Sequence, residues 1–389
     1  MELEDDIRDG VQGAFTRKPD AQEMGSLVEL SHAVGCRKVV VGFPAASPQE
    51  LDLCRSVIAR VAALRRDRPI IVLLARSVID DVAPIIDLAG ASGVEVRAEL
   101  YIGVSPVRMH VEGWSLEVVQ ERLHRTGAHL HASGTPFGVS LEDASRAPAE
   151  LLERLCAIAV DVGCESVTLC DTVGELTPDG AERLTRFVRG LLDRRERPVE
   201  LVWHGHNDKG LAVANALAAA RAGADTVSGA FLGLGERAGN TPLEQIAVLL
   251  SQSGNTRLNL GAIAPYARAL AECAGHSIPP STPIVGRQAF ATGAGTHSAA
   301  ILKARALGPE WEDHIFSGVA ASSLGARQEI IVGPLAGRHA VAHVLGQLGY
   351  RATERQQEEL IAFARTRREG LTSAEILAFL ARQPADRRG

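Results

Sequence analysis

The stretch Pro198-Val-Glu-Leu-Val-Trp-His-Gly-His-Asn-Asp208 indicates both how this chain folds and what chemistry it carries. Its first half is apolar and rich in strand-forming residues, which predicts a strand over 199–204. His204 and His206 are two positions apart, so their side chains point the same way on an extended backbone. Two such imidazoles and one carboxylate can bind a divalent ion and leave a coordination position open. Asp9, in Arg8-Asp9-Gly10, is the candidate carboxylate, and a packed histidine pair is the alternative.

Strand-like and helix-like segments alternate from residue 2 to about residue 250. The predicted strands are 3–8, 38–43, 69–74, 94–102, 129–137, 166–170, 199–204 and 226–230. The predicted helices include 21–34, 49–65, 115–125, 148–162, 178–192 and 211–222. Eight strand–helix units in about 250 residues predict an α/β fold of the (β/α)8 TIM-barrel type. An open doubly wound sheet is the competitor, but no Gly-x-Gly-x-x-Gly follows the first strand.

Polar residues recur where the predicted strands end. The set is Asp9, Arg76, Ser105, Arg108, Glu142, Asp171, Thr172, His204, His206 and Asn240. In a TIM barrel the carboxyl ends of all strands lie on one face, and that face holds the active site. The sequence therefore predicts an enzyme whose site is built from these strand ends.

The alternation stops after about residue 255. A helix over 260–274, a Gly-rich turn that contains His297, and helices near 339–348, 353–367 and 372–382 follow. We therefore expect a catalytic barrel over residues 1–255 and a mainly helical C-terminal extension over 256–389. We expect no long regulatory domain after that extension.

Composition excludes several classes of partner. The 389 residues are 46% hydrophobic and carry a formal net charge of −6, which indicates neither a nucleic-acid partner nor a membrane surface. No apolar run approaches the roughly 20 residues of a membrane span, and the acidic opening residues lead us to expect no signal peptide. The six cysteines lack Cys-x-x-Cys spacing, so we expect buried free thiols in a cytoplasmic protein.

Six motifs resemble those of the 2-isopropylmalate synthase and homocitrate synthase family, which are acyl-CoA-condensing TIM-barrel metalloenzymes. They are Arg8-Asp-Gly-Val-Gln12, Gly42-Phe-Pro-Ala-Ala-Ser47, Leu141-Glu-Asp-Ala-Ser-Arg146, Asp171-Thr-Val-Gly174, His204-Gly-His-Asn-Asp208 and Gly235-Glu-Arg-Ala-Gly-Asn240. Their order and spacing hold over nearly the whole chain.

The resemblance implies a divalent-metal site. Asp9, His204 and His206 would bind the ion, and Asn240 would lie in or near the same shell. Mg, Mn, Co and Zn all suit such a set of ligands. The ion would polarise the carbonyl group of a chelating 2-oxo acid.

The resemblance also implies roles around the metal. Arg8 would stabilise the developing negative charge, and Glu142 would serve in proton transfer. Thr172 would hold the carboxylate of the oxo acid, and Gln12 and Ser105 would belong to the same substrate-binding region. Acetyl-CoA would be the co-substrate.

The extension departs from the family pattern more than the barrel does. His297 would be an acid/base residue, often lent to the partner subunit's barrel, and the resemblance implies a homodimer. Val11 replaces an acidic residue, and the segment 333–338 lacks the family's Lys, His and Ser. Arg108, with Arg76, would read an anionic side group on the oxo acid, such as a carboxylate or a phosphonate. A solvated Arg108 is the alternative.

Four functional hypotheses follow from these patterns. The leading hypothesis is a metal-dependent Claisen condensation of acetyl-CoA with a 2-oxo acid, giving a 2-substituted malate and CoA. A 2-isopropylmalate synthase that uses 2-oxoisovalerate is the nearest alternative. An aldol lyase similar to 3-hydroxy-3-methylglutaryl-CoA lyase, and an inactive barrel that acts as a binding subunit, are the others.

Overall fold

The computed structural model describes residues 1–64 and 67–382. The chain divides into two compact units, Met1–Ile278 and a second that begins at Pro279. The first unit holds the parallel barrel and its helices, and the second is mainly helical. Each unit is described by itself below.

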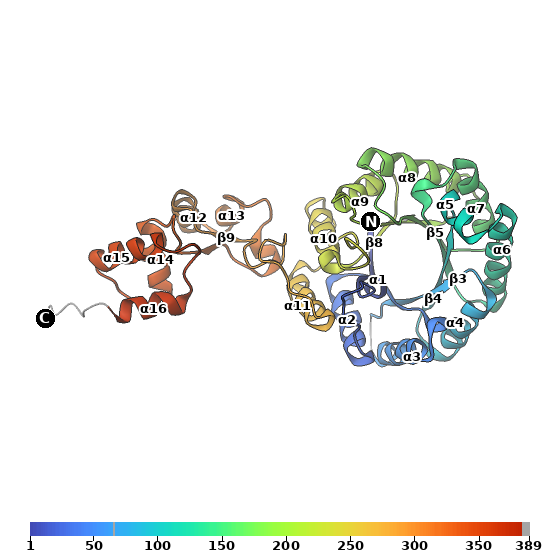
Figure 1. The fold of residues 1–389 in the computed structure, drawn as a ribbon, viewed down its shortest axis with the longest axis horizontal. Helices are drawn as coiled ribbons and strands as arrows, with labels where there is room; N and C mark the ends of the chain where they lie inside the picture. Colours follow the sequence, from blue (N-terminus) through green and yellow to red (C-terminus); the bar gives the residue numbers. More distant parts are fainter. Residues whose placement is uncertain (65–66, 383–389) are drawn as a thin grey trace. The chain divides into compact units, whose positions relative to one another are not determined.

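Eight parallel strands close into a barrel, which confirms the predicted TIM-barrel fold (Figure 1). They are β1 (Glu2–Asp6), β2 (Lys38–Gly42), β3 (Ile70–Arg76), β4 (Val96–Gly103), β5 (Phe137–Glu142), β6 (Ser166–Asp171), β7 (Glu200–Gly205) and β8 (Thr226–Gly229). Closure comes from β8 pairing with β1, with Leu3 opposite Val227. The strands consist of short runs of mostly buried residues, such as Val39-Val40-Val41 in β2. Continuous apolar runs are typical of parallel strands that are covered on both faces.

A ring of helices surrounds the strands in Figure 1. These are α2 (Ala21–Val34), α3 (Pro48–Ala62), α4 (Ile79–Ser92), α6 (Leu116–Ser133), α7 (Ala149–Asp161), α8 (Pro178–Leu192), α9 (Ala212–Arg221) and α10 (Leu243–Gln252). The last residue of the predicted helix 49–65, Arg65, lies outside the described residues. Capping fixes the helix ends; α2 begins at a capping box on Asp20 and ends at Gly35 in the left-handed conformation.

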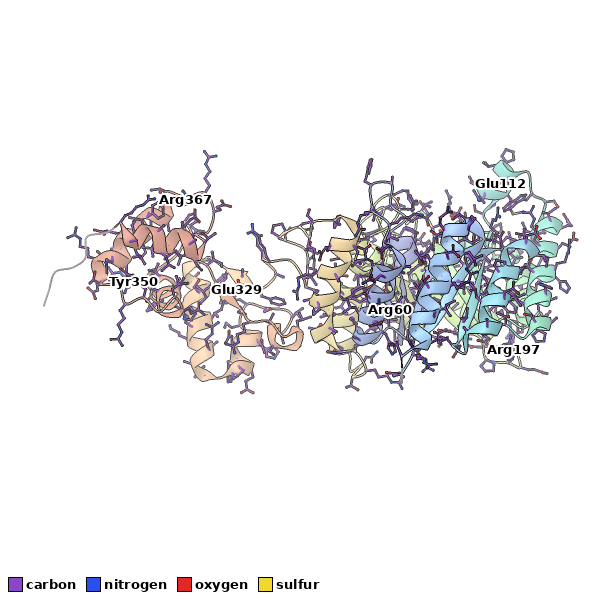
Figure 2. All side chains as sticks on the ribbon, turned by 90° about the horizontal axis from the view of Figure 1, so that it is seen from below. Arg60, Glu112, Arg197, Glu329, Tyr350 and Arg367 are labelled. Atoms are coloured by element: carbon purple, nitrogen blue, oxygen red, sulfur yellow. The ribbon has the colours of Figure 1, made fainter. Side chains whose placement is uncertain are left out.

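Short helical segments follow several strands at the C-terminal end of the barrel. They are α1 (Ile7–Gly10), η1 (Pro44–Ala46), α5 (Pro106–Glu112), η2 (Ala144–Arg146) and η3 (Phe231–Gly233). Figure 2 shows the two ends of the barrel, with Glu112 of α5 at one end and Arg197, which precedes β7, at the other. The loops near Glu112 therefore mark the face that holds the predicted site.

The predicted strand over 129–137 is wrong. Residues up to Ser133 continue α6, and the fifth strand is Phe137–Glu142. Ser115 caps the start of α6, Gly134 ends it at φ 74°, and Val119, Leu123 and Leu130 form its buried face. This helical spacing continues past residue 125, so the apolar residues near His129 belong to the helix.

The interior of the barrel at its N-terminal end is filled by charged side chains. Lys38 Nζ lies 2.5 Å from Glu200 Oε1, and Arg97 bridges Glu165 and Glu200. Lys38 and Arg97 are buried, so these pairs satisfy charges that apolar packing would leave without partners. These ion pairs occupy the end of the barrel interior opposite the predicted site.

Two elements beyond residue 255 pack with the barrel. η4 (Leu260–Ala262) and α11 (Ile263–Ala274) belong to the first unit, whereas the sequence placed the domain boundary at 255/256. Tyr266 of α11 donates a hydrogen bond to Asp5 of β1, and its ring meets Phe231 edge-on at 4.5 Å. This contact between α11 and β1 places the helix in the barrel unit.

The second unit contains a small two-stranded sheet and several helices. They are β9 (Ala291–Thr292), α12 (Gly295–Leu307), α13 (Pro309–His314), η5 (Ala321–Leu324), β10 (Glu329–Ile330), α14 (Arg338–Gln347), α15 (Glu354–Arg365) and α16 (Ser373–Ala381). Its own core includes Ile301, Val341, Leu360 and Ile376. Glu329, Tyr350 and Arg367 are labelled on this unit in Figure 2.

Two further expectations from the sequence concern the state of the cysteines and the presence of membrane-spanning helices. All six cysteines are free thiols, and all except Cys273 are buried. Among residues 1–64 and 67–382, no helix combines the length and apolar character needed to cross a bilayer.

Candidate active site and metal centre

The structure brings Asp9, His204 and His206 together at the C-terminal end of the barrel. One ligand atom from each lies within 4.8 Å of the others. The Nε2 atoms of His204 and His206 are 3.5 and 3.6 Å from Asp9 Oδ2. All three side chains are buried, and the two imidazole rings meet at 71° with centroids 5.3 Å apart. Three metal-binding atoms thus face one small volume.

Neighbouring polar groups hold two of these ligands in place. Asp6, at the end of β1, caps α1 by accepting a hydrogen bond from the backbone N–H of Asp9 at 2.8 Å. His204 lies on β7, and its Nδ1 is 3.2 Å from Ser228 Oγ on β8. Because Nδ1 is engaged with Ser228, the Nε2 atom of His204 is left to face Asp9.

The spacing of the ligand atoms fits a shared divalent ion. Atoms bound about 2.1 Å from one ion lie roughly 3.0 to 3.4 Å apart, close to the distances observed here. Asn240 is fully buried and forms a backbone bridge with His206. Its amide nitrogen donates to Leu234 O at 3.0 Å, while its Oδ1 has no partner in the described part of the chain. A buried oxygen without a partner suits a site that receives a cation.

Burial and neighbouring charges set the protonation of the three ligands. Burial alone would raise the pKa of Asp9, but its contacts with His204 and Arg8 hold that pKa below the usual range. Burial, aided by His204, lowers the pKa of His206 to about 4. Burial opposes the charged form of His204 too, but Asp9 raises its pKa above the ordinary value. An ionised carboxylate and a neutral imidazole are the forms that bind metal.

Arg8 lies beside these ligands and is oriented by two partners. Its guanidinium donates to Asp6 Oδ2 and to Gln12 Oε1, both at 2.7 Å, and lies 3.8 Å from Asp9 Oδ1. Its Nε is buried and has no partner among the described residues. Arg8 therefore holds a fixed cation and a free donor next to the metal ligands.

A cavity of about 490 Å³ opens over these groups. Seven of the predicted site residues line it, namely Arg8, Asp9, Gln12, Glu142, Thr172, His204 and His206. Phe43, Leu74 and Tyr101 provide apolar and aromatic wall. This size and mixture of surfaces are typical of a small-molecule site.

Glu142 and Thr172 face the same cavity with different properties. Burial raises the pKa of Glu142 despite the nearby Arg108 guanidinium, so its carboxyl is better able to exchange a proton near neutral pH. Thr172 Oγ1 accepts a hydrogen bond from the backbone N–H of Asp143 at 2.8 Å. Its hydroxyl proton is then available to a substrate oxygen.

Three predicted substrate residues lie outside the cavity wall. Arg76 is one of them, and it is paired with Asp81 through two hydrogen bonds of 2.7 and 2.8 Å.

The other two lie at the start of α5. Arg108 lies 3.2 Å from Glu112 and 3.5 Å from Glu142, and Ser105 caps α5 through the backbone N–H of Arg108. The hydroxyl of Ser105 is fully buried in this capping role. Ser105 therefore supports the loop after β4, and its predicted contact with substrate stays a prediction.

His297 belongs to the second unit. It lies in the first turn of α12, is exposed, and stacks on Phe316 with ring centroids 4.1 Å apart.

Sequence reasoning did not single out Glu99, Tyr101 or Arg237, which also line the cavity. Arg237 pairs with Asp208 and donates to the backbone O of Thr172, so it ties two strand-end loops together. Glu99 carried little signal, because Glu95, Arg97 and Glu99 alternate with apolar residues in the predicted strand 94–102, as residues on the polar face of a half-buried strand do.

Comparisons with known proteins agree with this geometry. The HMGL-like family model matches residues 3–269. A 2-isopropylmalate synthase of Pyrococcus furiosus is 31% identical over 88% of this chain and 68% of its own length. A homocitrate synthase of Methanopyrus kandleri is 30% identical over 91% of this chain and 84% of its own length.

Solved structures share the fold at lower identity. A hydroxymethylglutaryl-CoA lyase of Pseudomonas aeruginosa is 21% identical, with a TM-score of 0.61 over 71% of this chain and 93% of that chain. This likeness concerns the barrel fold alone.

Proposed function

The chain belongs to the HMGL-like family and groups with its acyl-CoA-condensing synthases, and we propose that it joins acetyl-CoA to a 2-oxo acid in a divalent-metal-dependent Claisen condensation. The products would be a 2-substituted malate and CoA. The observation that carries this proposal is the convergence of Asp9, His204 and His206 beside Arg8 on a cavity of substrate size.

The reaction requires a proton acceptor and a stabilised oxyanion. The methyl group of acetyl-CoA loses a proton, its carbon adds to the C2 carbonyl of the oxo acid, and the resulting alkoxide takes up a proton. Water then cleaves the thioester, which releases CoA and leaves a new carboxylate. This last step makes the overall condensation irreversible.

The described residues supply most of these needs. A divalent ion held by Asp9, His204 and His206, with Asn240 nearby, would polarise the C2 carbonyl as a Lewis acid. Arg8 would place its free Nε–H and its charge next to the developing alkoxide.

Glu142 would accept or relay the proton, because its raised pKa lies closer to neutral pH than that of an exposed glutamate. Thr172 would donate its hydroxyl proton to the carboxylate of the oxo acid. Both residues line the cavity from the ends of neighbouring strands, β5 and β6.

His297 would complete the proton transfers from the second unit, in a homodimer whose partner supplies it. Its ring is exposed in the first turn of α12, where it is accessible to another surface. A barrel site served by an exposed histidine of a partner is consistent with a two-fold dimer.

We propose no anionic side group on the oxo acid. Arg76 and Arg108 were the predicted readers of such a group, but both are paired with carboxylates and lie outside the cavity wall. Arg108 would have to leave Glu112 and Glu142 to reach a substrate anion.

Release of free thiol from acetyl-CoA, measured with and without a panel of 2-oxo acids and Mn or Mg, tests the proposal. We expect CoA release only when both an oxo acid and a divalent ion are present. Turnover with 2-oxoisovalerate alone would identify a 2-isopropylmalate synthase. Cleavage of 3-hydroxy-3-methylglutaryl-CoA without any condensation would support the lyase, and stoichiometric metal without either reaction would support a binding subunit.

A further inference from the structure

A buried carboxyl group forms part of the wall of the active-site cavity. Glu99, on β4, is only 8% exposed and lines the cavity with the metal ligands. Its Oε1 accepts hydrogen bonds from Ser140 Oγ at 2.6 Å and Thr168 Oγ1 at 3.0 Å. A Cβ atom on Gly138 would lie 2.1 Å from Glu99 Oε2, so the absence of a side chain there makes room for the carboxyl. The group is therefore held in a niche built for it.

No cation in the cavity wall neutralises Glu99, so far as the described residues show. Three cations line the cavity, and each lies against another carboxylate: Arg8 against Asp6, Lys18 against Glu50 and Arg237 against Asp208. A second carboxyl, Glu4, lines the same cavity. Burial, with the charge of Glu4, raises the pKa of Glu99 to about 7, and Arg97 opposes this shift only in part. A further negative charge in this region would be strongly disfavoured.

Glu99 lies deeper in the barrel than the groups assigned to the reaction. Its partner Thr168 is two residues before Cys170, which pairs with His204 across β6 and β7. Its other partner, Ser140, is two residues before Glu142 on β5. Two residues of a strand span roughly 6 to 7 Å, so Glu99 faces the end of an oxo acid's side chain about four or five bonds from its carbonyl.

Building on the proposed function, we infer that Glu99 selects the oxo acid by accepting a hydrogen bond from an uncharged donor, such as a hydroxyl, at the end of its side chain. An apolar side chain would cover Glu99 Oε2, the carboxylate oxygen that accepts from neither Ser140 nor Thr168, without offering it a donor, which costs binding energy. A side chain that ends in a carboxylate would be repelled by Glu99, whereas Glu4 lies 3.8 Å from Lys38 and is partly neutralised. A hydroxyl group satisfies Glu99 and avoids both penalties.

Three oxo acids of matched length test this inference at pH 8. They are 5-hydroxy-2-oxopentanoate, 2-oxohexanoate, in which a methyl group replaces the hydroxyl, and 2-oxoglutarate. Thiol release gives kcat/KM for each with the wild type, Glu99→Gln and Glu99→Leu. We expect the wild type to prefer the hydroxy acid by at least tenfold over each of the others.

The two variants separate hydrogen bonding from shape. Glu99→Gln keeps the shape and an acceptor, so it should retain the preference for the hydroxy acid over 2-oxohexanoate and tolerate 2-oxoglutarate better. Glu99→Leu should reverse the preference in favour of 2-oxohexanoate. A wild type that prefers 2-oxohexanoate or 2-oxoglutarate, or a Leu variant with unchanged preferences, would overturn the inference.

A binding measurement distinguishes failure of the Glu99 inference from failure of the proposed condensation. Without thiol release from any oxo acid, the condensation proposal fails, and the shift in melting temperature caused by each acid with Mn still ranks their binding. A larger shift with the hydroxy acid in the wild type, lost in Glu99→Leu, supports the role of Glu99. Equal shifts in both proteins overturn it.

Discussion

Asp6, at the end of β1, contacts both Asp9 and Arg8. One carboxylate oxygen caps the backbone of Asp9, and the other accepts from the guanidinium of Arg8 at 2.7 Å. Asp6 thereby positions Asp9, a proposed metal ligand, and the Arg8 cation beside it, without being a proposed ligand itself. Its own pKa is raised by burial, although Arg8 partly opposes that shift.

Asp6→Asn should separate the capping of Asp9 from the pairing with Arg8. The asparagine oxygen can still cap Asp9, but the charged partner of Arg8 is lost. We expect metal content near that of the wild type and a fall in kcat of about 10- to 100-fold, the usual cost of loosening a charge-stabilising group. Loss of metal together with activity would show that Asp6 acts mainly on Asp9.

Several of these residues were predictable from the sequence and others were not. Asp9, His204 and His206 were identifiable because strand ends of a barrel converge. Arg76 and Arg108 looked equally suitable, because the sequence analysis did not predict α5, in which Glu112 follows Arg108 by four residues. The pairing of Arg76 with Asp81 likewise depends on how the chain turns from β3 into α4.

At the scale of elements, the loop after β8 carries Asn240, which we propose lies near the metal. Gly239 has φ 88°, and a Cβ on it would lie 1.8 Å from the backbone O of Gly233. Gly235 has φ 137°, and a Cβ there would lie 2.3 Å from Asn240 Nδ2. The glycines thus allow the loop to close around Asn240.

Gly239→Ala should disturb this loop and the metal site with it. We expect at least a tenfold loss of metal affinity and a lower melting temperature, because backbone atoms cannot move aside as a flexible side chain can. Gly210→Ala is the matched control, since Gly210 also has positive φ but a Cβ added there would meet nothing within 4 Å. Equal effects of both changes would mean that backbone strain alone, and not loop closure, is responsible.

The packing of α10 against the barrel gives a pH-dependent stability. Glu244 of α10 is buried, and burial raises its pKa from 4.5 to about 7. The folded protein binds this proton more tightly than the unfolded chain. The free energy of unfolding should therefore fall as pH rises from about 4.5 to about 7, by on the order of 3 kcal/mol from this group.

Glu244→Gln should remove this contribution. Chemical unfolding at pH 5 and pH 8 should show a smaller loss of stability with rising pH than in the wild type. The exposed Glu121→Gln should leave the wild-type dependence unchanged. An unchanged dependence in Glu244→Gln would mean that the carboxyl is not protonated in the folded protein.

The wrong prediction of a strand over 129–137 also concerns a single element. The segment near His129 has strand-like apolar residues, but it lies near the end of an 18-residue helix. The barrel fold was still predictable, because the number of strand–helix units does not depend on where each boundary falls. Boundaries depend on caps such as Gly134, whose effect is local.

At the scale of the whole molecule, the residues proposed for the site come from two separate compact units. The barrel holds the proposed metal ligands, and the second unit holds His297. The sequence placed the end of the barrel domain at residue 255, and the contact of Tyr266 with Asp5 shows why α11 belongs to the first unit. A contact between residues this far apart in sequence is not visible from periodicity.

Mixing two inactive variants tests whether His297 serves the partner subunit. Asp9→Asn should lack metal, and His297→Ala should keep metal with low activity. If His297 acts on the partner's barrel, mixed dimers contain one intact site, and an equal mixture should recover roughly a quarter of wild-type activity. No recovery after subunit exchange would show that His297 acts within its own chain or not at all.

The most direct test of the metal centre is a metal titration of the chelator-treated protein, followed by thiol release with acetyl-CoA and an accepted 2-oxo acid. We predict that about one equivalent of Mn per chain restores activity, and that Asp9→Asn and His206→Ala neither bind the ion tightly nor recover. Full activity in the metal-free protein, or unaltered metal binding in both variants, would contradict the assignment of Asp9, His204 and His206 as the metal centre.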